Sequence, residues 1–450
     1  MISNKPKNII FTLLMIAFFC QGIAYSEVAI TVYNQDLALV RESREFDLDK
    51  GTQEIKFIDV AARIIPSSVH FSAKGVSLVE QNFEYDLVDA RKLTQKYLDN
   101  KIEIYTVNGD FFSGVLLAAS DALILREKDN TVRAIAYEKI LTSHYPSLPD
   151  GLITRPTLVW VVNSDKSAKR EGEVSYLTNG ISWTAEYVAV TDKNDNTIEL
   201  TGWTNIENNS GKTYEDAQIK LMAGDVQILR DNARRGRGKN RPSLMIESSN
   251  GSQFEEQAFY EYHLYTLQRP STVKNNQIKQ ISLFPAADVK TVKKEYRYSP
   301  SSDPSKVSVT LSFENDKDNN LAIPLPAGKI RVYKEGAGGS LEFVGEDRID
   351  HTPKNEKVKI STGNAFDIIG ERKQLDRQRK GNGRETEYEV SVRNHKDEPI
   401  EVIVTDRFWG DWSVVHATDG WKKVSAREIE WIVKLKPDEV KVINYRVLVE

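Results

Sequence analysis

The sequence predicts an all-β protein built from tandem β-sandwich-like domains, with a small barrel-like insert and little helix. Apolar residues recur at every second position, as at Val307, Val309, Leu311 and Phe313, which is typical of strands that bury one face. Turn-forming sequences rich in Gly, Asn and Asp separate these runs. Apolar residues at helical spacing are scarce by comparison, so we expect sheets to carry the cores.

The first residues have the layout of a secretory signal peptide. Lys5 and Lys7 precede an apolar run over residues 9–19, and a more polar stretch ends in Ala24-Tyr25-Ser26. The run is about 11 residues long, shorter than the roughly 20 that a membrane-spanning helix needs. We therefore expect residues 1–26 to be removed by cleavage near Ser26. The expected mature protein is periplasmic or extracellular and has no transmembrane segment.

Cys20 offers an alternative reading of the leader, because a cysteine near the end of an apolar stretch can be lipidated. That processing prefers a small residue before the cysteine, and Phe18-Phe19 stand there. Cys20 is also the only cysteine of the chain, so a protein cleaved near Ser26 forms no disulfide and depends on packed cores. The 450 residues suffice for about three domains. A net charge of −4 predicts no nucleic-acid partner.

Changes in the residue pattern along the chain predict four domains after the leader. They are an N-terminal strand-rich module at 27–86, a helix plus small barrel-like insert at 87–147, a β-rich domain at 148–285 and a C-terminal β-sandwich at 286–450. Pro146, Pro149, Gly151 and Pro156 mark the hinge after the insert.

The insert has the clearest internal pattern. A helix is predicted over residues 86–100, and five short strands follow at 102–107, 111–118, 122–126, 132–136 and 140–144. This order resembles SH3-like or Sm-like barrels in pattern, a likeness that carries no function by itself. A second, short helix is predicted at 213–221.

Two stretches are strongly basic. A mobile basic loop is predicted at 230–256, and a second basic loop at 372–384. Such loops could bind an anionic polymer or a lipid headgroup, but solvated basic loops are commoner, and we favour that interpretation.

No residue pattern typical of catalysis is found in the sequence. The six histidines stand singly, and there is no Gly-x-Ser-x-Gly elbow, His-Glu-x-x-His pair or phosphate loop. Asp192, Asn194 and Asn196 imitate the start of a calcium loop, but Thr197 and Trp203 stand where a glycine and a glutamate are needed. We interpret that stretch as a hairpin turn. No catalytic residue, metal ligand or cofactor is predicted.

Several motifs between residues 160 and 450 carry a family resemblance. They are Ser175-Tyr176-Leu177, Ile181 to Tyr187, Gly202-Trp203, Asn208 to Asp216, Leu325-Pro326-Ala327-Gly328, Gly345 to Pro353 and Gly363 to Arg372. In this order they resemble a bacterial family of unknown function, number 4139. Val32-Tyr33 and Leu37 to Val40 look like the N-terminal partner module of mucoidy-inhibitor-like relatives. Those relatives often carry a coiled coil where this chain has residues 87–147, and the resemblance implies fold and export rather than a mechanism.

Two clusters are candidate binding sites. Within one family motif, Asp347, Arg348, Asp350 and His351 follow Glu346 and could hold a ligand or form an ion-pair network that fixes a turn. We favour the structural role of this cluster.

The second cluster is aromatic. Trp409, Trp412 and Trp421 lie close together in sequence beside Phe408, either as exposed anchors for a partner or as core residues.

Together these observations predict an exported, non-catalytic protein that binds a partner or supports cell-envelope assembly, the partner being a protein or an envelope polymer. The alternative is a periplasmic or secreted hydrolase acting on glycan or peptide. RNA binding through the insert would require a cytoplasmic protein, which the leader opposes.

Overall fold

The computed structural model describes residues 28–224, 226–228, 253–381 and 383–450. Strands dominate these residues, and their one α-helix, α1 (Ala90–Lys96), has seven residues. The predicted all-β class is confirmed. The predicted leader and most of the predicted loop at 230–256 lie outside the described residues, and β16 (Phe254–Phe259) already begins within that loop.

The first and largest sheet has eleven strands. Its order is β16-β17-β15-β1-β2-β12-β4-β5-β11-β3, with β18 paired to β15. The strands are β1 (Val28–Tyr33), β2 (Ala38–Leu48), β3 (Gly51–Ile58), β4 (His70–Ala73), β5 (Val76–Glu84), β11 (Thr157–Ser164), β12 (Ala168–Thr178), β15 (Tyr214–Ala223), β16, β17 (Tyr262–Leu267) and β18 (Ser271–Val273).

The helix predicted at 213–221 is wrong, because this segment forms β15. Its buried residues include Ala217, Ile219 and Leu221, which follow the two-residue period of a strand. β15 pairs in parallel with β1 and antiparallel with β17. Hydrogen bonding to these two distant strands overrides the local helical pattern.

A five-stranded sheet follows, in the order β19-β14-β13-β22-β23. Its strands are β13 (Ile181–Thr191), β14 (Ile198–Asn208), β19 (Gln277–Val289), β22 (Gly328–Glu335) and β23 (Leu341–Ile349). β13 and β14 form a hairpin around residues 192–197. The predicted turn at that position is confirmed: Asp192 Oδ1 accepts hydrogen bonds from the amides of Asn196 and Thr197, at 2.7 and 3.1 Å.

The C-terminal sheet has nine strands, in the order β27-β30-β25-β24-β21-β20-β26-β29-β28. They are β20 (Lys293–Tyr298), β21 (Lys306–Glu314), β24 (Lys357–Lys380), β25 (Gly383–Asn394), β26 (Ile400–Arg407), β27 (Trp412–Ala417), β28 (Trp421–Ser425), β29 (Glu428–Leu435) and β30 (Val440–Val449). The basic loop predicted at 372–384 is wrong, since β24 and β25 pair along this stretch as far as Lys380 and Gly383. Ion pairs across the strands, such as Lys380 with Glu385 at 2.6 Å, compensate its basic charge.

The insert forms its own five-stranded sheet in the order β10-β6-β7-β8-β9, and the described pairing does not close it into the predicted barrel. Its strands are β6 (Lys101–Thr106), β7 (Phe111–Ala119), β8 (Ala122–Arg126), β9 (Val132–Ala136) and β10 (Ile140–His144). Asp89 caps α1 by accepting from the Lys92 amide at 2.8 Å, which starts the helix later than the predicted residue 86. A bridge between Leu87 and Ile153 joins the two chain segments that lead to the insert.

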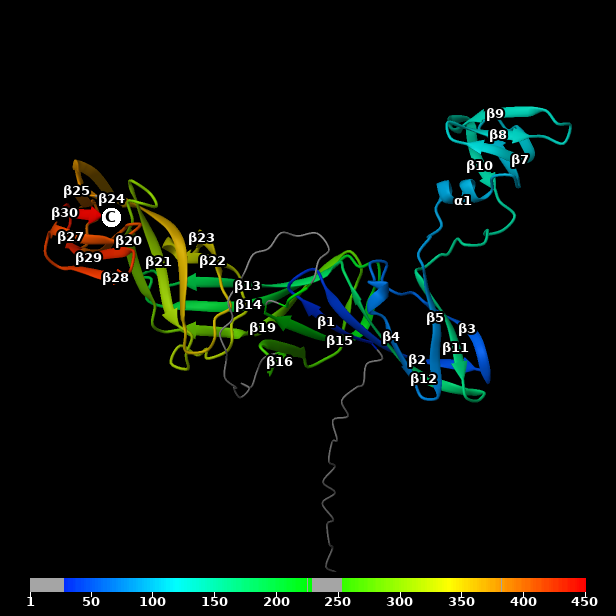
Figure 1. Cartoon of the computed structure of the whole chain (residues 1–450), viewed down its shortest axis with the longest axis horizontal. Coiled ribbons are helices and arrows are strands. Elements are labelled where there is room, and N and C mark those ends of the chain that lie inside the picture. The colour runs from blue at the N-terminus through cyan, green and yellow to red at the C-terminus, as the bar shows by residue number, and fades with distance from the viewer. Residues whose placement is uncertain (1–27, 225, 229–252, 382) are drawn as a thin grey trace, which may run out of the picture.

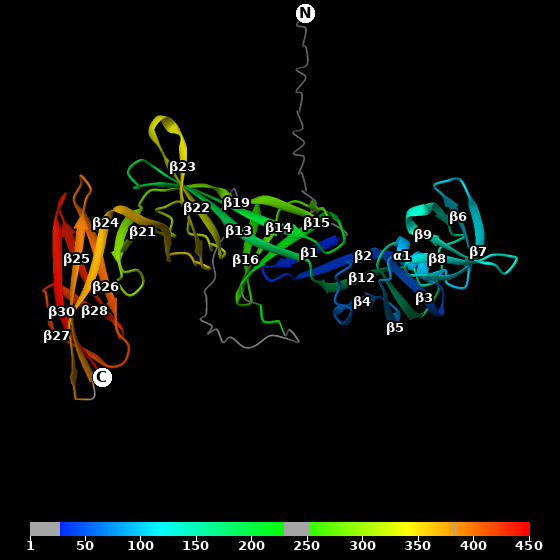
Figure 2. The same cartoon turned by 90° about the horizontal axis from the view of Figure 1, so that it is seen from above.

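The molecule is elongated, with the insert at one end and the nine-stranded sheet at the other (Figure 1, Figure 2). One hydrophobic core runs through the eleven- and five-stranded sheets and reaches residues of β21 and β24, while the C-terminal sheet and the insert each have a core of their own. Sheet membership crosses the predicted limits at 86 and 285, because β1–β5 share a sheet with β11 and β12, and β22 and β23 pair beside β13.

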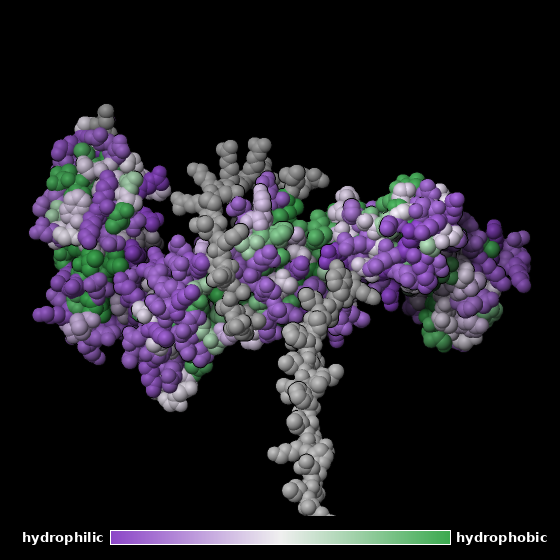
Figure 3. Space-filling model, turned by 90° about the horizontal axis from the view of Figure 1, so that it is seen from below, coloured by the Kyte–Doolittle hydropathy of each residue, from purple (hydrophilic) through white to green (hydrophobic). Residues whose placement is uncertain are grey.

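Apolar side chains also gather on the surface of the C-terminal sheet (Figure 3). Along the described parts of the chain, no helix has the length and apolar character needed to cross a membrane.

Candidate functional site

The four site residues predicted from the sequence lie at the end of β23 and in the turn after it. The Asp347 carboxylate accepts hydrogen bonds from two backbone amides. Its Oδ1 accepts from the Arg348 amide at 2.8 Å, and its Oδ2 accepts from the Ser361 amide of β24 at 2.6 Å. His351 Nδ1 accepts from the Ala327 amide at 3.1 Å, and the Asp350 carbonyl accepts from Thr352 Oγ1 at 2.8 Å. Arg348, Asp350 and His351 are exposed.

These contacts connect β23 to β24 and to the segment before β22. The Asp347 carboxylate therefore joins the end of β23 to β24 through backbone amides. Over the described ranges, no group of three or more His, Cys, Asp or Glu side chains is arranged to hold a metal ion.

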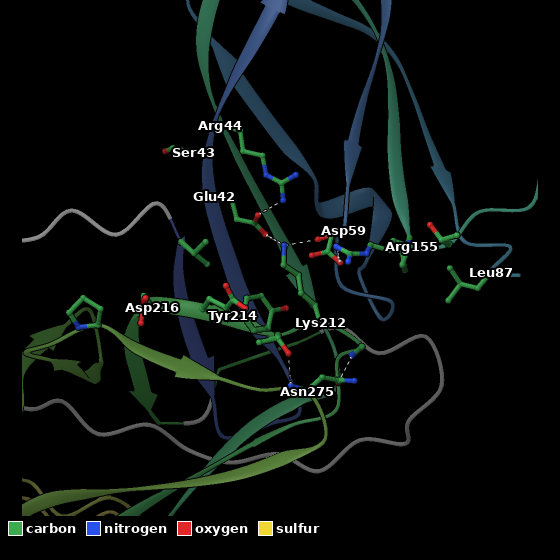
Figure 4. A pocket seen from close by; sticks show the side chains of 17 residues that line it. Glu42, Ser43, Arg44, Asp59, Leu87, Arg155, Lys212, Tyr214, Asp216 and Asn275 are labelled. Carbon is green, nitrogen blue, oxygen red and sulfur yellow. Dashed lines mark hydrogen bonds and ion pairs between the residues drawn. The ribbon is translucent and has the colours of Figure 1, made fainter.

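A larger site lies where the eleven-stranded sheet meets the stalk of the insert. It is an open cleft of about 1020 Å³ whose walls come from β2, the residues after β3, the two stalk segments, the start of β15 and the β18 region. Figure 4 shows Glu42, Arg44 and Lys212 pointing toward one another on its wall, with Asp59 and Arg155 beside them. Segments from the first 60 residues and from beyond residue 210 thus meet in one cleft.

Glu42 and Lys212 form a buried ion pair in the cleft wall. Lys212 Nζ lies 2.6 Å from Glu42 Oε1, and the two side chains are only 6% and 3% exposed. Lys212 also donates to the Asp59 carbonyl at 2.6 Å. Asp59 follows β3 with a φ of 69°, a left-handed conformation that Asp tolerates better than most residues.

Two further donors complete the coordination of the Glu42 carboxylate. Arg44 Nη2 donates to Oε2 at 2.7 Å, and the Tyr176 hydroxyl donates to Oε1 at 3.1 Å. The Arg44 guanidinium stacks on the Phe57 ring at 3.7 Å and donates to the Ile58 carbonyl at 2.8 Å. A buried charge is tolerated only when it is paired and hydrogen-bonded, and Glu42 meets both conditions.

The pKa of Glu42 follows from this surrounding. Burial alone raises the pKa of a carboxyl group, but the charges and hydrogen bonds of Lys212 and Arg44 outweigh it and hold the Glu42 pKa below its usual value. Burial raises the pKa of the Tyr176 and Tyr214 hydroxyls above the ordinary range. At neutral pH the wall therefore holds an ionised carboxylate beside neutral phenols.

The rim of the cleft keeps polar groups in reach of solvent. Arg155 Nη1 lies 3.6 Å from Asp59 Oδ1, with side chains 64% and 43% exposed. Asn275 Oδ1 accepts from the Gly211 amide at 2.9 Å and ties the β18 region to the start of β15. A charge-compensated wall below the exposed Arg155 guanidinium and the half-buried Asn275 amide favours the binding of a polar ligand.

The sequence did not predict a site at this wall, although three of its residues have a recognisable signal in the sequence. Glu42 occupies the inward phase of β2 together with Ala38 and Val40, so a charge at that position needs a buried partner. Lys212 and Tyr176 both lie in motifs that carry the family resemblance. The sequence does not predict that β1 pairs with β15, and this pairing brings the region of Glu42 close to the region of Lys212.

The tryptophan cluster divides between core and surface. Trp412 is 8% exposed and packs against Phe408 at a ring distance of 5.2 Å. Trp409 is 71% exposed, with the Arg427 guanidinium 4.5 Å over its ring. Trp421 is 40% exposed on edge strand β28. Both interpretations of the cluster thus apply, each to different residues.

Fold and site together define an elongated all-β protein of several sheets, with a polar cleft where two regions distant in sequence meet. Residues 173–450 match the family described as "Domain of unknown function (DUF4139)", and the chain belongs to this family. The match begins in β12 and includes Lys212 and Tyr176, while Glu42 lies before it. A comparison with curated proteins gave no match.

Proposed function

We propose that this chain is an exported, non-catalytic protein that binds a protein or envelope-polymer partner in the cleft beside the Glu42–Lys212 pair. The observation that carries the binding role is the coordination of Glu42. Its two carboxylate oxygens accept from Lys212, Arg44 and Tyr176, so the wall of the cleft is fixed before any ligand arrives.

The same coordination argues against proton transfer by these groups. A general acid or base works best with a pKa near the operating pH, whereas the Glu42 pKa is lowered and the pKa values of Tyr176 and Tyr214 are raised. Lys212 Nζ donates to the Glu42 carboxylate and to the Asp59 carbonyl, so its hydrogen bonds are made within the wall of the cleft. Binding therefore accounts for this geometry better than catalysis.

Export rests on the leader, where two lysines, an apolar run and Ala24-Tyr25-Ser26 follow one another. The test is fractionation of cells that produce the full chain, followed by N-terminal analysis of the recovered protein. We expect a periplasmic or secreted protein beginning at Glu27. Full-length chain confined to the cytosol would contradict export.

Partner binding is tested by capture from envelope extracts. Immobilised wild type is compared with Arg155→Ala, which removes the exposed rim guanidinium, and with Arg41→Ala, which removes a half-exposed arginine outside the cleft lining. We expect a stoichiometric partner that wild type and Arg41→Ala retain and Arg155→Ala loses.

Equal capture by both variants would contradict binding in the cleft. Turnover of glycan or peptide by the purified protein, abolished in Asp350→Ala or His351→Ala, would instead establish the hydrolase.

A further inference from the structure

A second, smaller cavity lies between the five-stranded sheet and the C-terminal sheet. It encloses about 300 Å³, and its lining includes Asp195 from the β13–β14 turn, Lys294 and Tyr296 of β20, Lys334 of β22 and residues 362–367 of β24. The cavity is separate from the cleft at the insert stalk, because the two have no lining residue in common.

Two ammonium groups share one carboxylate in this cavity. Lys294 Nζ lies 2.8 Å from Asp195 Oδ2, and Lys334 Nζ lies 2.6 Å from Oδ1. The Asp195 side chain is 10% exposed, against 31% and 33% for the two lysines. Two positive charges against one negative charge leave a net positive charge on this triad.

A third lysine adds to that charge. Lys396 lines the cavity, and its Nζ lies 5.6 Å from the centroid of the Tyr296 ring, which also has Lys294 Nζ at 5.5 Å. The Glu398 carboxylate lies 3.3 Å from Lys396, but its side chain is 63% exposed, so solvent screens this pair. Asp367 is the remaining acidic residue of the lining and is exposed.

The donor chemistry of the cavity selects the ligand. Each ammonium has three N–H donors, and Asp195 takes one from Lys294 and one from Lys334. The remaining donors suit a compact oxyanion, because a lysine binds phosphate or carboxylate as a point charge. Phe366, 94% exposed at the rim, provides an apolar contact for the body of the ligand.

We propose that the cavity lined by Lys294, Lys334 and Lys396 binds a compact oxyanion, a phosphate or carboxylate group of a small free ligand. Asp195 is an internal anion that competes with the ligand for the donors of Lys294 and Lys334. Because the lining comes from both the five-stranded and the C-terminal sheet, the bound anion also holds these two sheets together.

The test is calorimetric titration of the full mature chain with inorganic phosphate, and in parallel with acetate, at constant ionic strength. Lys396→Met removes the lysine that does not hold Asp195, and Lys422→Met removes an exposed lysine on β28 as a matched control. We expect Lys396→Met to weaken phosphate binding about tenfold, the effect of losing one charge-assisted hydrogen bond. The control should bind as wild type does.

Asp195→Asn gives a test of opposite sign. Asparagine has nearly the same shape and tolerates the positive φ of 59° at this position, but it lacks the charge that competes with the ligand. We expect this variant to bind phosphate more tightly than wild type, which a merely structural triad would not produce. Hydrogen exchange should slow over residues 362–367 when phosphate is added.

Two results would overturn the proposal. One is binding of neither anion to wild type, or equal phosphate affinity in wild type, Lys396→Met and Asp195→Asn. The other is binding to vesicles of anionic phospholipid without binding to free phosphate or acetate, which would assign the charge to a membrane surface.

Discussion

Lys212 Nζ lies 2.6 Å from Glu42 Oε1 across a sequence separation of 170 residues, and both side chains are almost fully buried. The pair joins β2 to the segment that enters β15, on either side of β1. Removal of one partner leaves a buried, unpaired charge, and this lowers the free energy of unfolding by a measurable amount.

Lys212→Met is expected to lower the free energy of unfolding by about 3–5 kcal/mol, since it strands the Glu42 carboxylate in the core. Urea denaturation measures the loss. Lys169→Met is the matched control: Lys169 pairs with Glu45 of the same strand β2, but the side chains are 67% and 63% exposed. The control should change stability little, because solvent screens an exposed ion pair. Equal losses in the two variants would show that the buried pair contributes no more to stability than the exposed pair does.

Stability is expected to fall in acid because of Glu42. Its pKa in the folded protein is lowered from 4.5, with burial opposing and Lys212 and Arg44 producing the shift. A group with a depressed folded pKa contributes stability above its unfolded pKa and loses it as pH falls through the folded value. Unfolding free energies measured from neutral pH down past 4.5 should therefore decrease in wild type and decrease less steeply in Glu42→Gln. Parallel curves would be evidence against this assignment.

Gly328→Ala is expected to destabilise the five-stranded sheet by about 1–3 kcal/mol, the usual cost of forcing atoms into a packed site. A Cβ at this position would run into the backbone carbonyl of Ala185 on β13, which cannot move aside as a side chain can. Gly336→Ala is the control, because its Cβ would come no nearer than 3.1 Å, to the Ser340 hydroxyl. Thermal melts followed by near-ultraviolet circular dichroism measure both, and an unchanged Gly328→Ala melt would refute the tight approach.

Trp412→Ala and Trp409→Ala are expected to differ widely despite their closeness in sequence. Trp412 is 8% exposed and donates from Nε1 to the Ala426 carbonyl at 2.8 Å, so its truncation should cost about 3–5 kcal/mol. Trp409 is 71% exposed, and its truncation should cost about 0.5 kcal/mol or less. Denaturation midpoints compare the two. Similar losses would place both rings in the core.

The local pattern of the sequence predicted individual strands well. The five strands expected between 102 and 144 agree with β6 to β10 to within a residue at each end, since turn residues and two-residue periodicity are both local signals. The segment at 213–221 was wrongly predicted as a helix, because the local sequence does not indicate that this segment pairs with β1 and β17. Strand pairing over long separations also explains why sheets cross the predicted domain limits.

The candidate site was harder to predict for the same reason. A charged residue at an inward position, such as Glu42, signals a buried partner but does not say which residue it is. Arg44 is a neighbour on the same strand, but Lys212 and Tyr176 become partners of Glu42 only after the eleven-stranded sheet has formed. The cluster at 347–351 is a dense run of polar residues and therefore a candidate site in the sequence. In the structure, its Asp347 carboxylate accepts hydrogen bonds from two backbone amides.

The most direct test of the proposed function is photo-cross-linking in cells that export the full chain. A photoreactive amino acid is placed at Arg155 on the cleft rim and, separately, at Lys422 on β28, which lies outside the cleft lining. Adducts are identified by mass spectrometry. One recurrent protein or glycan adduct at position 155 that is absent at position 422 is the predicted result, and the same diffuse adducts at both positions would contradict a binding role for the cleft.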